Sequence, residues 1–277
     1  MFDAGPAQDT PLMQDPAFAA ALRRCGQSPI VLQSGLMLLH RRVLGIPITM
    51  LPRAVPPDDL DRQLRAHNLH RTPLVLSPER PCTLPRAMRL RGPQFLAQLR
   101  LHPDVDTARA ALHPKCRNQL GRAEAAGLRV SHRPLPPKLT HPLLRLETAQ
   151  ARARRYANWP AALTAAFAAV APDQTRLFMA HQKGTVVAHM LFFRHGARAT
   201  YHIGHITAAG KACSAHNLLL WQASRWLAAQ GHDALDLGLI DPRTPGLNRF
   251  KLRTGAVTAQ TGGTWLRWRP LARGGDP

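Results

Sequence analysis

The chain has 277 residues and a mass of 30.5 kDa, which is enough for one large domain or two small ones. Hydrophobic residues make up 45% of it, a share that excludes a wholly disordered chain. No apolar run approaches the roughly 18 residues of a membrane-spanning helix, and the first residues lack the basic start and apolar core of a secretory signal peptide. We therefore expect a cytoplasmic protein without membrane insertion.

The net charge is +21, from 37 basic and 16 acidic side chains. A charge of this size is typical of proteins with a polyanionic partner such as RNA. Only five of the basic residues are lysine, however, and the arginines are scattered through a chain rich in Ala, Pro and Leu. Two explanations stay open: a real electropositive face on a basic protein, or the compositional bias of a GC-rich genome.

The cysteine and histidine patterns give no support to a metal site or a disulfide framework. The four cysteines, Cys25, Cys82, Cys116 and Cys213, are far apart in the sequence and form no C-x-x-C pair. The histidine pairs belong to no H-E-x-x-H or mixed Cys/His motif. We expect no bound metal.

In chain order, the first third reads as a small proline-rich α/β unit. A tail and a short helix ending near Cys25 come first, and a helix with Pro and Asp at its start covers 56–68. Strands are predicted at 29–32, 35–43, 47–51, 73–76, 87–91 and 94–101. We find no catalytic motif in this part.

A helix is predicted over 113–127, from Pro114 to a stop at Gly127. Its apolar stripe consists of Leu112, Cys116, Leu120 and Ala123. A second, polar and mostly basic row consists of Lys115, Asn118 and Arg122. This row is either a solvated helix face or an electropositive ridge that binds a phosphate-bearing substrate.

After the helix at 113–127, the remaining predicted elements follow the order β-α-α-β-β-β-α-β-α-β. Strands are predicted at 128–132, 175–181, 185–193, 198–203, 234–239 and, at a sheet edge, 264–269; helices are predicted at 142–155, 160–171, 214–230 and 245–252.

Three runs of sequence accompany this order: RNQLGRAEAAGLRV (Arg117–Val130), ALDLG (Ala234–Gly238) and GLNRFKLRTGA (Gly246–Ala256). Together with the order of elements, they resemble the FemAB-like branch of the GNAT acyltransferase superfamily. The resemblance implies an α/β (α+β) fold in which a GNAT-like mixed sheet flanked by helices is preceded by a smaller, degenerate GNAT-like unit. The expected divisions are a tail and short helix at 1–28, the degenerate unit at 29–111 and the acyltransferase domain at 112–277.

The resemblance also implies a function. An enzyme of this kind, an N-acetyltransferase or a relative, moves an acetyl or aminoacyl group from acyl-CoA or aminoacyl-tRNA to an amine. We expect direct attack by the amine, since the chain has no nucleophile motif such as G-x-S-x-G. The alternative is a non-catalytic basic GNAT-like module that binds RNA, for example tRNA, or another polyanion.

The resemblance places the acyl-CoA pyrophosphate at the loop after the third meander strand. The candidate residues there are Thr207, Gly210, Lys211 and Ala212, with Asn217 in the helix that follows. Thr207 stands where many GNAT enzymes have Gln or Arg, a departure that favours aminoacyl-tRNA or the non-catalytic alternative.

Four residues are catalytic candidates. Tyr201 would protonate the leaving group and His202 would accept the amine proton, although alternation lets only one face the cleft. The other interpretation is a strand-end aromatic and a surface histidine. Asp236, an acid on an otherwise apolar strand, is either part of the site or a structural partner. Lys251 is either a ligand of a phosphate or oxyanion or a solvated lysine.

Two further side-chain patterns concern substrate binding. Asn248 lies one turn from Lys251 and shares its predicted side of the short helix, whereas Leu247 and Phe250 are expected to face the core. Trp265, Arg267 and Arg269 alternate near the C-terminus, either to stack on bases or to pair at a sheet edge.

Overall fold

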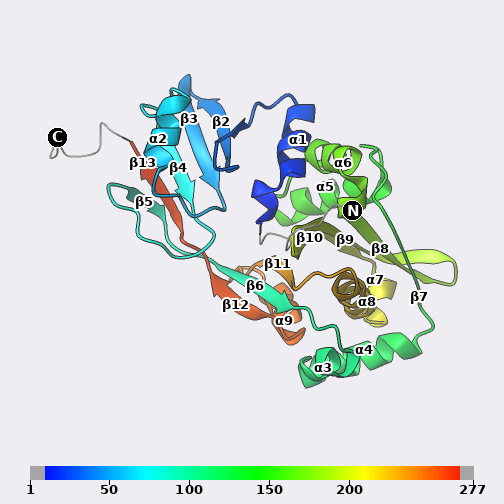
Figure 1. Cartoon of the computed structure of the whole chain (residues 1–277). Helices are drawn as coiled ribbons and strands as arrows, with labels where there is room; N and C mark the ends of the chain where they lie inside the picture. The colour runs from blue at the N-terminus through cyan, green and yellow to red at the C-terminus, as the bar shows by residue number, and fades with distance from the viewer. Residues whose placement is uncertain (1–9, 269–277) are drawn as a thin grey trace, which may run out of the picture. The chain divides into compact units, whose positions relative to one another are not determined.

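The computed structural model of the chain describes residues 10–268, which form two sheets (Figure 1). Contacts divide these residues into two units. Unit 1 consists of residues 10–12 and 97–258, and unit 2 of residues 13–96 and 259–268. Each unit has its own hydrophobic core.

Unit 1 is built on a seven-stranded sheet of order β12-β6-β11-β10-β9-β8-β7. The strands are β6 (Phe95–Arg100), β7 (Arg129–Arg133), β8 (Thr175–Gln182), β9 (Thr185–His195), β10 (Arg198–Ile206), β11 (Ala234–Leu239) and β12 (Val257–Gln260). The helices are α3 (Val105–Ala110), α4 (Pro114–Ala125), α5 (Pro142–Arg154), α6 (Ala161–Val170), α7 (Ala208–Ala212), α8 (Ala215–Ala229) and α9 (Pro245–Arg253). The sheet is mixed: β7 to β10 form an antiparallel meander, and β11 joins β10 in parallel.

Helices cover both faces of this sheet, as Figure 1 shows for α5 and α6 on one side and α8 on the other. Phe192 and Phe193 on β9 demonstrate it, because successive side chains of a strand point to opposite faces. The Phe193 ring packs on Phe167 of α6 at 4.5 Å, whereas the Phe192 ring packs on Phe178 at 5.7 Å, in the cluster that α8 covers. Both rings are fully buried, so the centre of the meander is a core strand.

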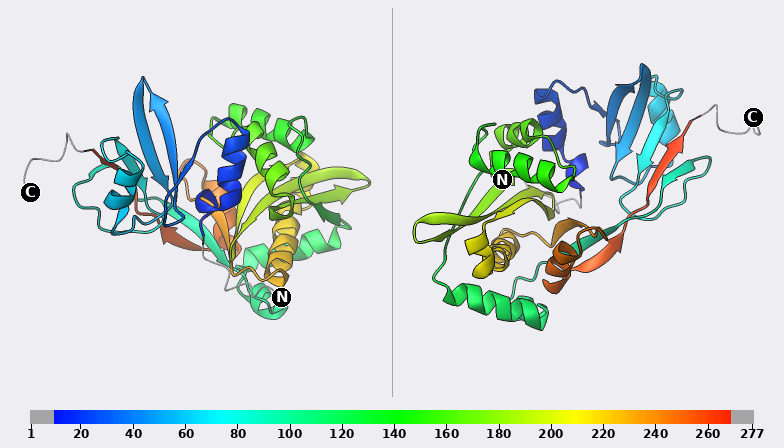
Figure 2. Two further views of the ribbon diagram at one scale, coloured as in Figure 1. Left: turned by 45° about the horizontal axis from the view of Figure 1, so that its top comes forward. Right: turned by 180° about the vertical axis from the view of Figure 1, so that it is seen from behind.

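Unit 2 has a six-stranded sheet of order β1-β2-β3-β4-β13-β5. Its strands are β1 (Ile30–Val31), β2 (Met37–Val43), β3 (Ile46–Pro52), β4 (Leu74–Ser77), β5 (Met88–Arg91) and β13 (Thr264–Arg267), and its helices are α1 (Pro16–Arg24) and α2 (Leu60–Ala66). The core is mainly leucine, with Leu38, Leu51 and Leu64 among its buried members. Figure 2 shows the β2–β3 hairpin as a ribbon that extends beyond the rest of this sheet.

The strand near the C-terminus is not at a sheet edge, contrary to the prediction. β13 lies between β4 and β5, with Trp265 opposite Leu76 on one side and Arg89 on the other. The indole of Trp265 packs against the leucine core and its Nε1 donates to the carbonyl of Gly262 at 2.8 Å. Arg267 pairs with Asp61 at 2.7 Å. The proposed base-stacking face is therefore used for folding; Arg269 lies outside the described residues.

The other predicted elements are present within a few residues of their expected ends. The described residues also form α3, α7 and β12, which the patterns do not predict. Both short helices depend on one capping side chain: Asp104 accepts from the N–H of Thr107, and Thr207 accepts from that of Gly210. The two units also divide elsewhere than expected, because contacts group 97–111 with unit 1 and 259–268 with unit 2. In the part of the chain that is described, no helix combines the length and apolarity needed to cross a bilayer.

Candidate active site where strands β10 and β11 part

Strands β10 and β11 are paired for only three residues before they separate. The last pair is Thr200 with Asp236, yet β10 continues to Ile206 and β11 to Leu239. On its other side, β10 has a bulge against β9 between Tyr201 and Ile203. The bulge therefore begins at Tyr201, directly after the last pair with β11. Because a bulge bends a strand and increases its twist, it explains why β10 turns away from β11 here.

The separation exposes backbone groups that a neighbouring strand would otherwise bind. Three side chains donate to the carbonyl oxygens of β10 instead. The amide of Gln150 on α5 bonds to the oxygen of Gly204 at 3.1 Å, and that of Asn158 to His202 at 3.4 Å. On the opposite side, the ring Nε2 of His216 on α8 lies 3.0 Å from the oxygen of His205. Helices α5 and α8, with the segment that follows α5, therefore hold β10 at the bulge and just beyond it.

Tyr201 is the first residue beyond the last β10–β11 pair. Its ring lies 5.7 Å from that of Phe192, on the α8 face. The hydroxyl lies over Gly204, where a Cβ would overlap it. Burial raises the pKa of the phenol, which therefore stays protonated at neutral pH and retains a proton to donate.

His202 points to the opposite face, as strand alternation predicts. Its ring stacks on Phe193 at 4.4 Å and lies 4.9 Å from Trp159. The Nε2 atom is 2.9 Å from the hydroxyl of Thr164. Burial lowers the pKa of this imidazole to about 3. The ring is thus neutral at physiological pH, and its surroundings suit packing better than proton transfer; it is not a surface histidine.

Lys251 is buried, not exposed towards a cleft as expected. Only 5% of the residue is accessible, and Nζ donates to the carbonyl oxygen of Leu239 at 2.8 Å. Burial lowers the pKa of the ammonium to about 8, against the opposing effect of the Asp236 and Asp241 carboxylates. Gly238 has a φ of +82°, and a Cβ at this position would lie 3.6 Å from Nζ. Lys251 therefore supports the end of β11, at the border of the separation.

The rest of α9 also differs from the expectation. Leu247 is 43% exposed and does not anchor the helix, whereas Phe250 is partly buried against the main core. Asn248 bonds to both backbone groups of Asp241, through Nδ2 at 2.7 Å and Oδ1 at 3.2 Å. The prediction that Leu247 faces the core was wrong, because α9 is buried on the side that carries Lys251. That side packs against the end of β11, where Lys251 bonds to Leu239. Asp236 accepts from the N–H of Gly238 at 2.7 Å, a contact that shapes this same strand end.

The predicted pyrophosphate loop is α7 and its cap. The Thr207 hydroxyl donates to the oxygen of Val187 and accepts from the N–H of Gly210, each at 3.1 Å. A Cβ at Gly210 would lie only 2.4 Å from the Val187 oxygen. The loop glycine therefore serves close packing on β9, and its N–H is already bound. The N–H groups of Ala208 and Ala209 in the first turn, both in exposed residues, suit a phosphate better.

The other loop and helix candidates fall into two groups. Lys211 and Ala212 are exposed on α7, and Lys115, Asn118 and Arg122 form an exposed row on α4. Asn217 instead links two helices, since its amide lies 3.5 Å from Sγ of Cys116 and 3.4 Å from Oε1 of Gln119. The stripe that includes Cys116 is buried as predicted.

A hydrogen-bonded group around Glu147 was missed from the sequence. This carboxylate on α5 is 6% exposed and accepts from the hydroxyl of Tyr156 at 2.9 Å and the amide of Asn158 at 2.7 Å. The amide of Gln150 also bonds to the Tyr156 hydroxyl, at 2.9 Å. Through Gln150 and Asn158 the group reaches both bulge carbonyls. The signal in the sequence is an acid four residues after Leu143, on the apolar face of its helix.

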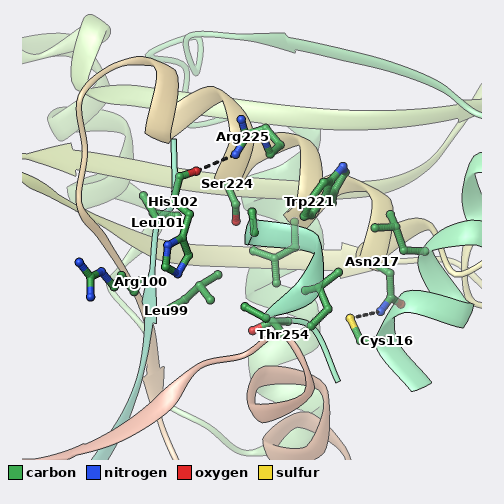
Figure 3. Close-up of a pocket in the computed structure, with 15 residues that line it drawn as sticks. Leu99, Arg100, Leu101, His102, Cys116, Asn217, Trp221, Ser224, Arg225 and Thr254 are labelled. Atoms are coloured by element: carbon green, nitrogen blue, oxygen red, sulfur yellow. Dashed lines mark hydrogen bonds between the residues drawn. The ribbon is translucent and has the colours of Figure 1, made fainter. Parts of the chain in front are cut away.

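A separate small cavity lies between α4, α8 and the end of β6 (Figure 3). Its volume is about 40 Å³, far below that of a substrate pocket. Leucines and Trp221 line it, and the guanidinium of Arg225 closes one end by bonding to the oxygen of His102 at 2.6 Å. None of Tyr201, Asp236 and Lys251 borders this cavity. Among the described residues, no three Cys, His, Asp or Glu side chains are placed to hold a metal.

A family model described as an acetyltransferase (GNAT) domain matches residues 114–252, half of the chain. The chain belongs to the GNAT family. The match contains the bulge, α7 and most of α9, so the separation of β10 and β11 lies inside the GNAT domain. Searching the curated proteins finds no match.

Solved structures share the fold over nearly the whole chain. The crystal structure of FemX matches with a TM-score of 0.73 and 11% identity, covering 96% of this chain and 94% of FemX. The C-terminal domain of a putative lysylphosphatidylglycerol synthetase from Agrobacterium fabrum matches with a TM-score of 0.63 and 15% identity, over 94% and 90% of the two chains. A tandem GNAT protein from the clavulanic acid biosynthesis pathway matches at 0.52 and 14%, over 95% and 90%. These likenesses confirm the FemAB-like GNAT fold with two GNAT-like units.

Proposed function

We propose that this GNAT chain is an N-acyltransferase whose reaction takes place where β10 and β11 part. The observation that carries the proposal is that the last strand pair, Thr200–Asp236, is followed at once by the bulge and by the partly buried phenol of Tyr201. The attacking amine forms a bond to the acyl carbon, the C–S or C–O bond to the donor breaks, and the amine loses one proton while the leaving group gains one.

The residues around the separation suit these steps. Backbone N–H groups at the released strand edges would bind the oxyanion, as preorganised donors do in other acyl transfers. Tyr201 would donate the proton to the leaving thiolate or ribose oxygen. Lys251 would contribute positive charge and hold the end of β11. His202 is left out of proton transfer because burial lowers its pKa to about 3, which makes the imidazole a weak base, and because the ring is packed among aromatic rings.

The donor is either acyl-CoA or aminoacyl-tRNA, and the acceptor is an amine. The bound N–H of Gly210 and the Thr207 cap favour aminoacyl-tRNA, since they leave only part of the loop for a pyrophosphate. Similarity to FemX and to a putative lysylphosphatidylglycerol synthetase points the same way.

Thermal melts with matched ligands test the donor. A ligand that binds only the folded state raises the midpoint by mass action. We expect a larger shift with aminoacyl-tRNA than with the same tRNA uncharged, and a smaller shift with acetyl-CoA. A larger shift with acetyl-CoA would assign acyl-CoA as donor. Equal shifts with charged and uncharged tRNA, and no release of the acyl group from either donor in the presence of amines, would refute the enzyme.

That last result would favour the second candidate, a basic RNA-binding module. The exposed row of Lys115, Asn118 and Arg122 supports it. Affinity for tRNA should then fall steeply with salt through counterion release, and replacing Lys115 and Arg122 by Ala should lower the salt slope by about two. The exposed pair Arg133 and Lys138, replaced in the same way, is the control.

A further inference from the structure

The β2–β3 hairpin of unit 2 ends in a turn that breaks two local rules at one residue. Leu44 and Gly45 connect the paired residues Val43 and Ile46, and both have positive φ, of 51° and 81°. Turns of this kind favour Asn-Gly or Asp-Gly, because other side chains rarely adopt the first position. Leu44 is also 97% exposed. A large apolar side chain that is strained and fully in water indicates a function for the tip.

The neighbouring residues extend this feature into a two-zone surface. Val43 and Ile46 are 50% and 52% exposed and complete an apolar tip with Leu44. Directly below the tip, the exposed side chains of Arg41 and Arg42 form an arginine collar. The hairpin projects beyond the rest of its sheet (Figure 2), so both zones are accessible within unit 2.

The charge around the hairpin is uniformly positive. No Asp or Glu occurs between Asp15 and Asp58, a stretch that includes all of β2 and β3. The described part of unit 2 contains thirteen arginines and five acidic residues. Because an extended strand rises about 3.3 Å per residue, the collar lies roughly 7–10 Å behind Leu44. This depth is comparable with that of the headgroup layer that interfacial segments enter.

We propose that the apolar tip inserts into the surface of an anionic lipid membrane while the arginine collar binds lipid phosphates. Three aliphatic side chains at the end of a narrow ribbon cannot supply the roughly 800 Å² per partner of a stable protein interface. RNA fits poorly, because the tip has no aromatic ring on which a base could stack. A bilayer accepts a narrow apolar insertion beside basic side chains. The contact is peripheral and does not depend on the proposed acyl transfer.

Flotation of the full chain with vesicles tests the proposal. One set consists of equal parts phosphatidylcholine and phosphatidylglycerol, the other of phosphatidylcholine alone. We expect binding to the first set that falls with salt. Leu44→Asn should lower this binding roughly tenfold by removing the inserted side chain, and should keep or raise the thermal midpoint because Asn-Gly suits the turn. Arg41→Gln with Arg42→Gln should lower it about fivefold for each arginine.

Leu90→Asn is the matched control, since Leu90 is 52% exposed on β5 of the same sheet and lies outside the tip. It should bind like the unchanged protein. Absence of binding to anionic vesicles, or equal binding to both vesicle sets, would overturn the proposal. So would a Leu44→Asn protein that melts normally and binds as before. Self-association in the absence of lipid that Leu44→Asn abolishes would assign the tip to a second copy of the chain instead.

Discussion

Tyr201 is the residue on which the proposed chemistry depends most directly. Tyr201→Phe removes one hydroxyl and leaves the ring contact with Phe192, so the fold should lose about 1 kcal/mol or less. If the phenol protonates the leaving group, the transfer rate should fall about 10²–10⁴-fold. Single-turnover acyl transfer and urea unfolding measure the two effects. A variant with the unchanged rate would remove Tyr201 from the mechanism.

Lys251 gives a second prediction at this scale, in the pH dependence of stability. Its pKa is about 8 in the folded chain and ordinarily 10.5, so between these values the unfolded state binds more protons. The free energy of unfolding should therefore rise with pH from 8 to 10.5, by on the order of 3 kcal/mol from this group.

Urea unfolding at about pH 7.5 and about pH 10 compares Lys251→Met with the exposed control Lys211→Met. The rise should be smaller in Lys251→Met than in Lys211→Met, which should match the unchanged chain. The same rise in all three proteins would contradict the burial of the ammonium. Since Lys251 is buried, its replacement should change stability as well as activity, unlike that of the exposed lysine expected from the sequence.

At the scale of elements, the packing of α7 on β9 is set by one glycine. Gly210→Ala would press a methyl group against the oxygen of Val187, 2.4 Å away, and should destabilise the chain by about 1–3 kcal/mol. Gly121 in α4 is the matched control, because its missing Cβ has open space around it. Gly121→Ala should stabilise by about 0.4–1 kcal/mol. Equal effects of the two substitutions in thermal melts would refute this account of the loop.

The Glu147 group connects α5 to the bulge of β10 and gives the second element-scale prediction. In Glu147→Gln, the amide oxygen can still accept from Tyr156 and Asn158, which both bond to Oε1. The new NH2 group takes the place of Oε2, 3.5 Å from the amide nitrogen of Gln150, so a buried donor would be left unpaired at a cost of about 1–3 kcal/mol. Transfer should slow as well, because Gln150 and Asn158 hold the bulge carbonyls. Glu124→Gln, which breaks the exposed pair with Arg109, should cost about 1 kcal/mol or less. Urea unfolding measures the free energy of unfolding of both variants. An equal loss in the two would contradict the special role of the buried Glu147 group.

For the whole molecule, we expect partly buried histidines to lower the stability in acid. Burial lowers the pKa of His189 and His216 to about 4 and that of His202 to about 3, from 6.5. The unfolded state therefore binds more protons below pH 6.5, and the free energy of unfolding should decrease as the pH falls from 6.5 to 4. His202→Gln should make this decrease shallower, whereas the exposed control His67→Gln should not. Unfolding followed across this range checks the slope, and identical slopes would contradict the assignment.

Much of the chain's local structure could be predicted because its signals are local. Pro114 and Gly127 bracket α4, its stripe of Leu112, Cys116, Leu120 and Ala123 is buried, and the meander strands begin near their predicted residues. The alternation of Tyr201 and His202 also follows from strand geometry alone. Together with the run GLNRFKLRTGA (Gly246–Ala256), these patterns predicted the GNAT fold.

What only the tertiary structure decided is which groups lose contact with water and which distant segments meet. β13 pairs with β4 and β5, far away in sequence, so its local pattern resembled that of an edge strand. Lys251 is buried because the end of β11 covers it, and Glu147 because Tyr156 and Asn158 supply its hydrogen bonds. A periodic pattern defines the face of an element, but burial depends on the partner that covers that face, and the sequence alone does not specify that partner.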